Sequence, residues 1–164
     1  MEQKTKRLAV AIGGEAIRFL NLHIALNAAL AKSDDTRYIA VDTDAATLMC
    51  AWAPHRLQIG EKRTFGLGTN GDASLGRRAA EESRAELSDL FVGAEKACLF
   101  TGLQGGTGPG ATPVICACAA AAGLNTTLIA MTDGNEPTEK ETSLLAEWRT
   151  LADKLRIIPY ARTR

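Results

Sequence analysis

Short apolar runs alternate with longer amphipathic or alanine-rich segments along this chain. Continuous apolar runs bounded by glycine or polar residues predict buried strands. Such runs span residues 8–12, 38–41, 97–101, 126–131 and 155–158. The segments between them carry apolar residues at helical spacing and predict helices. These helices are expected at residues 16–32, 45–52 (with Asp44 as N-cap), 77–90, 111–122 (with Gly123 at its C-terminal end) and 139–151.

The alternation of strands and helices predicts the fold class. Strands that are apolar throughout, rather than on alternate residues, are typical of a parallel sheet covered on both faces. We therefore expect an α/β fold, a three-layer, doubly wound and mostly parallel sheet of Rossmann-like type. Residues 57–76 contain five glycines among polar residues and predict a long ordered loop. Ligands of such sheets bind beyond the carboxyl ends of the strands, where the glycine-rich segments of this chain fall.

Composition narrows the class of protein. The 164 residues carry 19 basic and 19 acidic side chains, without a basic run suited to nucleic acid or an anionic membrane. No apolar run approaches the length of a membrane span, and the charged residues 1–7 do not resemble a signal peptide. The four cysteines lack a CxxC spacing. We expect one domain over residues 1–164, in the cytoplasm, with no nucleic-acid or membrane partner.

The segment from Gly105 to Gly110, GGTGPG, joins a predicted strand to a predicted helix. Glycines let backbone N–H groups converge on an oxyanion, and a helix N-terminus adds its positive dipole end. A phosphate group is the natural ligand, and a tight turn that only brings strand and helix together is the alternative. The segment is not a P-loop, because no GK[ST] follows. Gly106-x-Gly108-x-x-Ala111, with Asp133 after the next strand, also fits the relaxed dinucleotide pattern.

Several motifs together resemble the FtsZ/tubulin family. They are IAVDTDA at residues 39–45, QIGEK at 58–62, GLG at 66–68, GRRAAEES at 76–83, GGTG at 105–108 and LRIIP at 155–159. They occur in the family's order and nearly at its spacing. The chain is thus similar to the N-terminal GTP-binding domain of that family, whose members bind GTP across the strand ends and stack head to tail.

The resemblance implies a set of site residues. The phosphate cradle would be formed by Gly105, Gly106, Thr107, Gly108 and Gly110. The loop that senses the terminal phosphate would be Gly68, Thr69, Asn70 and Gly71, and the first phosphate loop would be reduced to Gly13 and Gly14. Asp42, Thr43 and Asp44 would lie near the nucleotide and its Mg²⁺, although a helix cap explains either aspartate equally well. Tyr160 stands in the place of the family's base-reading asparagine.

The chain departs from the family at the site itself. Glu15 follows Gly13-Gly14 where the family has asparagine. A carboxylate suits the positive end of the helix dipole there, but it would repel a bound triphosphate. In the cradle Gln104 replaces a glycine and Pro109 a threonine, and Pro109 removes an N–H donor. The segment after Met131 is shorter than in the family, and the ribose-contacting residues have no clear match. Glu136, Glu139 and Arg149 are the nearby candidates.

The family's central helix and acidic catalytic loop would lie beyond Arg164, so the resemblance covers only the N-terminal half of the family. We expect a domain that binds GTP or GDP, with Mg²⁺, and that hydrolyses little or none of it unaided. No catalytic residue and no all-protein metal site is assigned. The alternative is an interaction module that has kept the fold and lost the nucleotide, with another copy or an FtsZ-like protein as partner. Dinucleotide binding is a third hypothesis.

Overall fold

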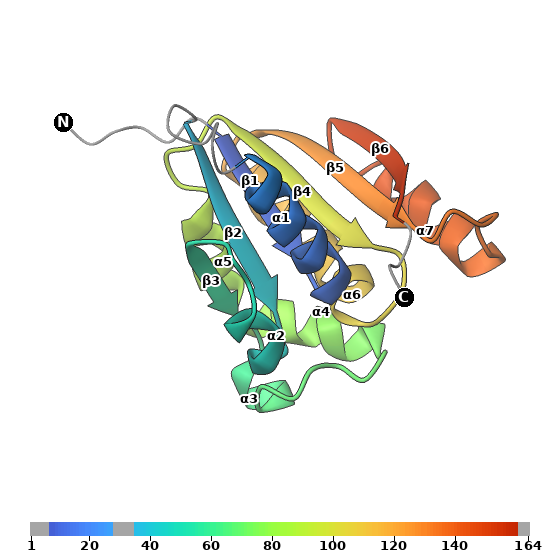
Figure 1. The fold of residues 1–164 in the computed structure, drawn as a ribbon, viewed down its shortest axis with the longest axis horizontal. Coiled ribbons are helices and arrows are strands. Elements are labelled where there is room, and N and C mark those ends of the chain that lie inside the picture. The colour runs from blue at the N-terminus through green and yellow to red at the C-terminus, as the bar shows by residue number, and fades with distance from the viewer. Residues whose placement is uncertain (1–6, 28–34, 161–164) are drawn as a thin grey trace.

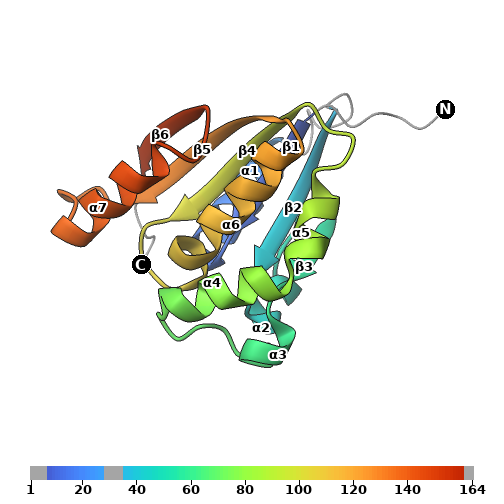
Figure 2. The same ribbon diagram turned by 180° about the vertical axis from the view of Figure 1, so that it is seen from behind.

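The computed structural model describes residues 7–27 and 35–160, which form one six-stranded sheet with helices on both faces (Figures 1 and 2). All strand pairs are parallel, and the strand order is β3-β2-β1-β4-β5-β6. The strands are β1 Arg7–Ile12, β2 Thr36–Asp42, β3 His55–Gln58, β4 Lys96–Gly102, β5 Asn125–Thr132 and β6 Lys154–Pro159. The predicted α/β fold with a doubly wound sheet is confirmed, and the described sheet is wholly parallel.

Two groups of helices cover the sheet. They are α1 Gly14–Asn27, α2 Ala45–Met49, α3 Glu61–Thr64, α4 Ala73–Glu82, α5 Arg84–Leu90, α6 Thr107–Ala121 and α7 Glu139–Trp148. Helix α1 lies on the face turned to the viewer in Figure 1, and α4, α5, α6 and α7 lie behind the sheet, as Figure 2 shows from the other side. The resulting three layers are those expected of a parallel sheet, which needs apolar cover on both faces.

Each face has its own apolar core. On the α6 side, strand residues such as Val10 and Leu99 pack with Ile115, Phe91 and the fully buried Trp148. On the α1 side, Ala11 and Ala40 of the sheet pack with Ile17 and Leu20 of α1 and with Leu48 of α2. Helix α1 begins at Gly14, two residues after β1 ends at Ile12, so its N-terminus lies just beyond the end of β1.

The prediction of a long loop over residues 57–76 is wrong, because much of this segment is regular secondary structure. It contains the end of β3, the short helix α3 and the first turn of α4. The strand His55–Gln58 was missed because its residues are mostly polar and it lies at the edge of the sheet, where burial is partial. An edge strand does not need the continuous apolar run that identified the central strands.

The predicted helix 77–90 is also wrong, because it is two helices that meet at Ser83. Ser83 is buried, and its hydroxyl oxygen accepts a hydrogen bond from the Gly60 amide at 2.9 Å. This hydrogen bond connects the junction of α4 and α5 to the turn after β3. Other boundaries differ by a few residues: α1 begins at Gly14, α2 ends at Met49, and α7 ends at Trp148. The predicted end of the first helix at residue 32 lies outside the described residues.

The start of α6 differs most from the prediction. The helix begins at Thr107, four residues before the predicted Ala111, so most of the glycine segment forms its first turn. Glycine and proline have low helix propensity, which hid this turn in the sequence. Proline is nevertheless tolerated in a first turn, because its missing N–H would have had no intrahelical acceptor there. The C-terminal end of α6 agrees with the prediction. Gly123 directly follows the C-cap residue Ala122, and Gly123 has a left-handed conformation.

Candidate functional site

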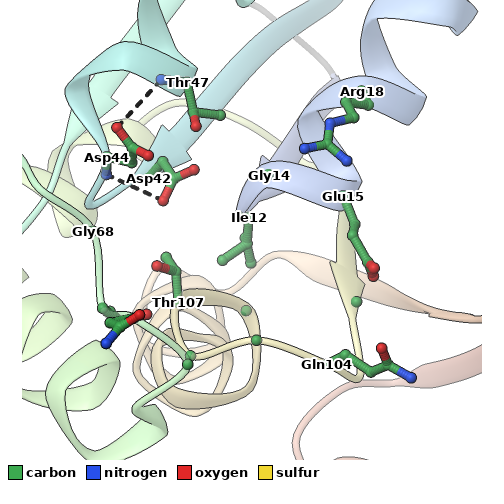
Figure 3. Close-up of a pocket in the computed structure, with 18 of the residues that line it drawn as sticks. Ile12, Gly14, Glu15, Arg18, Asp42, Asp44, Thr47, Gly68, Gln104 and Thr107 are labelled. Atoms are coloured by element: carbon green, nitrogen blue, oxygen red, sulfur yellow. Dashed lines mark hydrogen bonds between the residues drawn. The ribbon is translucent and has the colours of Figure 1, made fainter.

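A hollow of about 450 Å³ opens at the carboxyl ends of β1, β2 and β4 (Figure 3). Its walls come from four turns: Gly13–Gly14 after β1, Asp42 and Asp44 after β2, residues 67–71 before α4, and residues 104–108 after β4. β1 and β4 are neighbours in the sheet, and the strand order reverses between them. Ligands of doubly wound sheets bind at this kind of switch point. We refer to this space as the main hollow.

The glycines of the main hollow permit backbone contacts that a side chain would prevent. A Cβ atom on Gly106 would overlap the Thr69 hydroxyl and lie 2.7 Å from both the amide nitrogen and the carbonyl oxygen of Asp72. A Cβ atom on Gly13 would lie 3.2 Å from the amide nitrogen of Gly108. The turns after β1 and β4 and the segment before α4 are therefore packed backbone against backbone. This packing gathers amide groups around one space.

Two helices, α1 and α6, begin at the main hollow. The amides in the first turn of a helix have no intrahelical acceptor, and no side chain caps them at the start of α6. Free amides and the positive end of the helix dipole both favour an anion. Gly105, with φ of 82° and open space where a Cβ would lie, leaves the approach to α6 clear. The arrangement fits a phosphate group.

Asp42 is a buried carboxyl group beside this space. It accepts hydrogen bonds from the amides of Thr43 at 2.7 Å and Asp44 at 3.3 Å. The Thr43 hydroxyl in turn bonds to the Thr107 hydroxyl at 2.8 Å, which joins the end of β2 to the first turn of α6. Burial raises the pKa of Asp42, and the hydrogen bonds from the backbone of Asp44 and Thr43 act in the opposite direction. A bound anion would meet a carboxyl group that is already costly to ionise.

Asp44 has a structural role. Its carboxylate accepts from the amides of Ala46 at 2.9 Å and Thr47 at 3.5 Å and so caps α2. Its Cβ also lies 3.6 Å from the position of a Cβ on Gly68. Within the described residues there is no cluster of three or more His, Cys, Asp or Glu side chains that could hold a metal ion. Asp42 and Asp44 would instead suit Mg²⁺ that keeps water and phosphate oxygens as most of its ligands.

Most of the predicted site residues come together here. The residues that line the main hollow are Gly13, Gly14, Asp42, Asp44, Gly68, Thr69, Asn70, Gly71, Gly105, Gly106, Thr107 and Gly108. Thr43 lies buried at its edge, bonded to Thr107. Gly110 faces α4 instead, where a Cβ would overlap the carbonyl oxygen of Ala73. Gln104 and Glu15, the departures noted in the sequence, both line the hollow.

A second, narrow hollow adjoins the first and shares Glu15 and Gln104 with it. Its remaining walls are Leu103, Met131, Thr132, Asp133, Glu141 and Tyr160. Tyr160 packs edge-on against Phe19, with ring centroids 5.9 Å apart. Gln104 donates from Nε2 to Asp133 at 3.4 Å across this space. Glu136, Glu139 and Arg149, the candidates for ribose contact, line neither hollow.

Sequence reasoning missed Arg18, Thr47 and Glu141 as lining residues. For Arg18 a signal was present, since it lies one helical turn after Gly14 and so on the same side of α1. Thr47 similarly lies three residues after the lining residue Asp44, the N-cap of α2, and so on the same side of that helix. Glu141 gave no such signal, because it belongs to a capping box with Thr138 at the start of α7.

These features define a class of protein: a parallel α/β domain whose strand-end glycine turns and helix N-termini form one anion-binding hollow. A family comparison narrows the class. The sequence model of the Tubulin/FtsZ family, GTPase domain, matches residues 9–146, and the chain belongs to that family.

Solved structures agree in fold. An empty FtsZ dimer from M. jannaschii has a TM-score of 0.81 at 25% identity and covers 97% of this chain and 46% of its own. CetZ2 from Haloferax volcanii, a GTPγS-bound protofilament, has a TM-score of 0.80 at 21% identity, covering 94% of this chain and 51% of its own. TubZ of Clostridium botulinum phage c-st has a TM-score of 0.73 at 13% identity, with 98% and 55% covered. The chain thus spans about half the length of these proteins. No helix in the described segments is long and apolar enough to cross a bilayer.

Proposed function

We propose that this chain binds GTP or GDP, with Mg²⁺, in the main hollow, and that it hydrolyses little or no nucleotide by itself. The observation that carries the proposal is the convergence of glycine turns from several strand ends and two helix N-termini on one space of about 450 Å³. That volume lies within the usual range for ligand sites, roughly 300–1,000 Å³. Family membership and the GTPγS bound by CetZ2 favour a guanine nucleotide.

The proposal also gives the nucleotide an orientation. The phosphates would lie on the glycine turns, and the base would point to the second hollow, where Leu103, Met131 and Tyr160 offer apolar and aromatic contact. Because the second hollow is narrow, the Gln104–Asp133 contact would have to open for a purine to enter. Asp42 and Asp44 would act through Mg²⁺, which screens their charge from the phosphates.

Nucleotide binding is testable by calorimetric titration of GTP, GDP and ATP with Mg²⁺, together with thermal melts. A ligand at 100 times its Kd adds about 2.7 kcal/mol to the free energy of unfolding, so the melting temperature of the wild-type protein should rise with GTP or GDP. Gly106→Ala should abolish the rise, since its methyl group would displace residues 69–72. Gly93→Ala is the control: it alters a left-handed turn outside both hollows, with open space around it.

A second function is favoured by the charges of the site. Among the residues that the structure describes, those that line the main hollow include the carboxylates of Glu15, Asp42 and Asp44 and one cationic side chain, Arg18. This excess of carboxylates supports an interaction module that has lost its nucleotide and binds another copy or an FtsZ-like protein. It predicts melting temperatures indifferent to every nucleotide. A rise with NAD but not with GTP would instead support the dinucleotide hypothesis, for which the strand order is equally suited.

A further inference from the structure

Arg18 is the one basic side chain among the described residues that line the main hollow. The other charged residues there are carboxylates, and a nucleotide would add several negative charges of its own. Backbone amides supply only partial positive charge, and Pro109 contributes no amide to the first turn of α6. Binding a di- or triphosphate in this space therefore calls for a full positive charge in addition to Mg²⁺.

The position of Arg18 allows it to reach the hollow. It lies in the second turn of α1, whose N-terminus opens onto this space. Side chains on a helix lean toward its N-terminus, which here means toward the ligand site. Figure 3 shows the side chains of Arg18 and Glu15 leaving the helix in different directions, with Glu15 extending toward Gln104. The carboxylate of Glu15 packs against Gly102, where it would overlap an added Cβ.

The guanidinium group of Arg18 is available for a ligand. Its side chain is exposed and forms no hydrogen bond or ion pair with any residue in the described part of the chain. The ion pair found there joins Arg84 to Glu81, at the junction of α4 and α5. A guanidinium presents a planar set of donors that matches phosphate oxygens in pairs.

We propose that Arg18 binds the outer phosphates of the nucleotide and makes the site selective for di- and triphosphates over monophosphates. This inference rests on the proposed function. With the base toward Tyr160, the outer phosphates extend away from the second hollow, to the side formed by Gly68 and Asp44. In Figure 3 the Arg18 guanidinium lies beside the first turn of α1, above Glu15, and Gln104 lies at the bottom of the view. Arg18 thus offsets the carboxylates that otherwise oppose a charged ligand.

The test is calorimetric titration of GTP, GDP and GMP, with Mg²⁺, into the wild-type protein and its Arg18→Ala, Arg18→Lys and Arg78→Ala variants. A hydrogen-bonded contact to a charged group corresponds to roughly a 10- to 100-fold change in affinity. We expect Arg18→Ala to weaken GTP and GDP by about that factor and GMP far less. Arg18→Lys should lie between the wild type and Arg18→Ala. Arg78→Ala removes an exposed arginine of α4 outside both hollows and should leave all three affinities unchanged.

The outcomes separate the two proposals. Unchanged GTP and GDP binding in Arg18→Ala would overturn the role of Arg18 and leave nucleotide binding intact. An equal loss for GTP, GDP and GMP would also overturn it, because the selectivity for outer phosphates would be absent. A wild-type protein that binds no nucleotide at millimolar concentration would reject the proposed function and this inference together. Circular dichroism and thermal melts of each variant show whether the fold is retained.

Discussion

The protonation of Asp42, a residue of the main hollow, affects the stability of the domain. The carboxyl group is buried at the edge of the main hollow, so its charged form loses hydration, and burial raises its pKa. A carboxyl group whose pKa is higher in the folded protein than in the unfolded chain stabilises the fold only while protonated. Its contribution is complete below the unfolded pKa and is lost as the pH rises through the folded pKa. At neutral pH the group therefore costs free energy of folding.

Asp42→Asn should remove this pH dependence, because an asparagine oxygen accepts the same amide hydrogen bonds from Thr43 and Asp44 without a charge. In nucleotide-free buffer with a chelator, we expect the variant to gain stability relative to the wild type as the pH rises from acidic to neutral. Urea unfolding at several pH values measures the difference. Asp89→Asn, on the exposed surface of α5, is the control. A difference between Asp42→Asn and wild type that does not change with pH would contradict the argument.

At the same scale, the sequence predicted most of the described residues that line the main hollow and missed Arg18, the basic side chain among them. Glycine turns are visible in a sequence because few other residues suit them, whereas an arginine on a helix is usually a solvated surface residue. The spacing of Arg18 from Gly14 is informative only once the N-terminus of α1 is placed beyond the end of β1. Gly110 shows the converse, since its motif predicts a cradle residue and its backbone faces α4.

At the scale of elements, the crossing of α4 and α6 supports the site. A Cβ atom on Gly76 would overlap the carbonyl oxygen of Gly106, and one on Gly110 would overlap that of Ala73 and lie 2.7 Å from the Arg77 amide. The helices therefore touch through their backbones. This contact explains why α6 begins with residues of poor helix propensity: the space beside it admits no larger side chain. The sequence predicted the start of α6 too late, because helix propensity is a local property and the contact between α4 and α6 is a tertiary one.

Gly110→Ala tests this crossing. In a helix alanine is intrinsically favoured over glycine by about 1 kcal/mol, so without a clash the variant would be more stable. Because the added methyl group meets the backbone of α4, we expect a net loss of about 1–3 kcal/mol in the free energy of unfolding. Ala120→Ser, on the exposed side of α6, should change stability by less than about 0.5 kcal/mol. A stabilised Gly110→Ala would show that the two helices separate at little cost.

At the scale of the whole molecule, the central strands and the order of the motifs were sufficient to predict the fold and the family. Buried parallel strands read as apolar runs, and β1, β2, β4 and β5 are of this kind. The polar edge strand β3 and the short helix α3 were hidden because neighbouring elements determine them more than their own residues do. Catalysis is subject to the same limit, because phosphoryl transfer depends on how the nucleotide and the attacking water are positioned, which local sequence does not determine.

GTP turnover by the isolated chain tests that dependence. Hydrolysis requires a water molecule held in line with the terminal phosphate. The carboxylates that border the main hollow have other contacts: Oδ1 of Asp42 and Oδ1 of Asp44 accept backbone amides, and Glu15 extends toward Gln104. We therefore expect phosphate release from GTP and Mg²⁺ at the rate of the buffer blank, under conditions where calorimetry shows the nucleotide bound. We also expect no nucleotide-dependent pelleting of the chain in sedimentation. Release that scales with protein concentration and disappears in Gly106→Ala would show that the main hollow contains its own catalytic group, and Glu15 would then be the first residue to substitute.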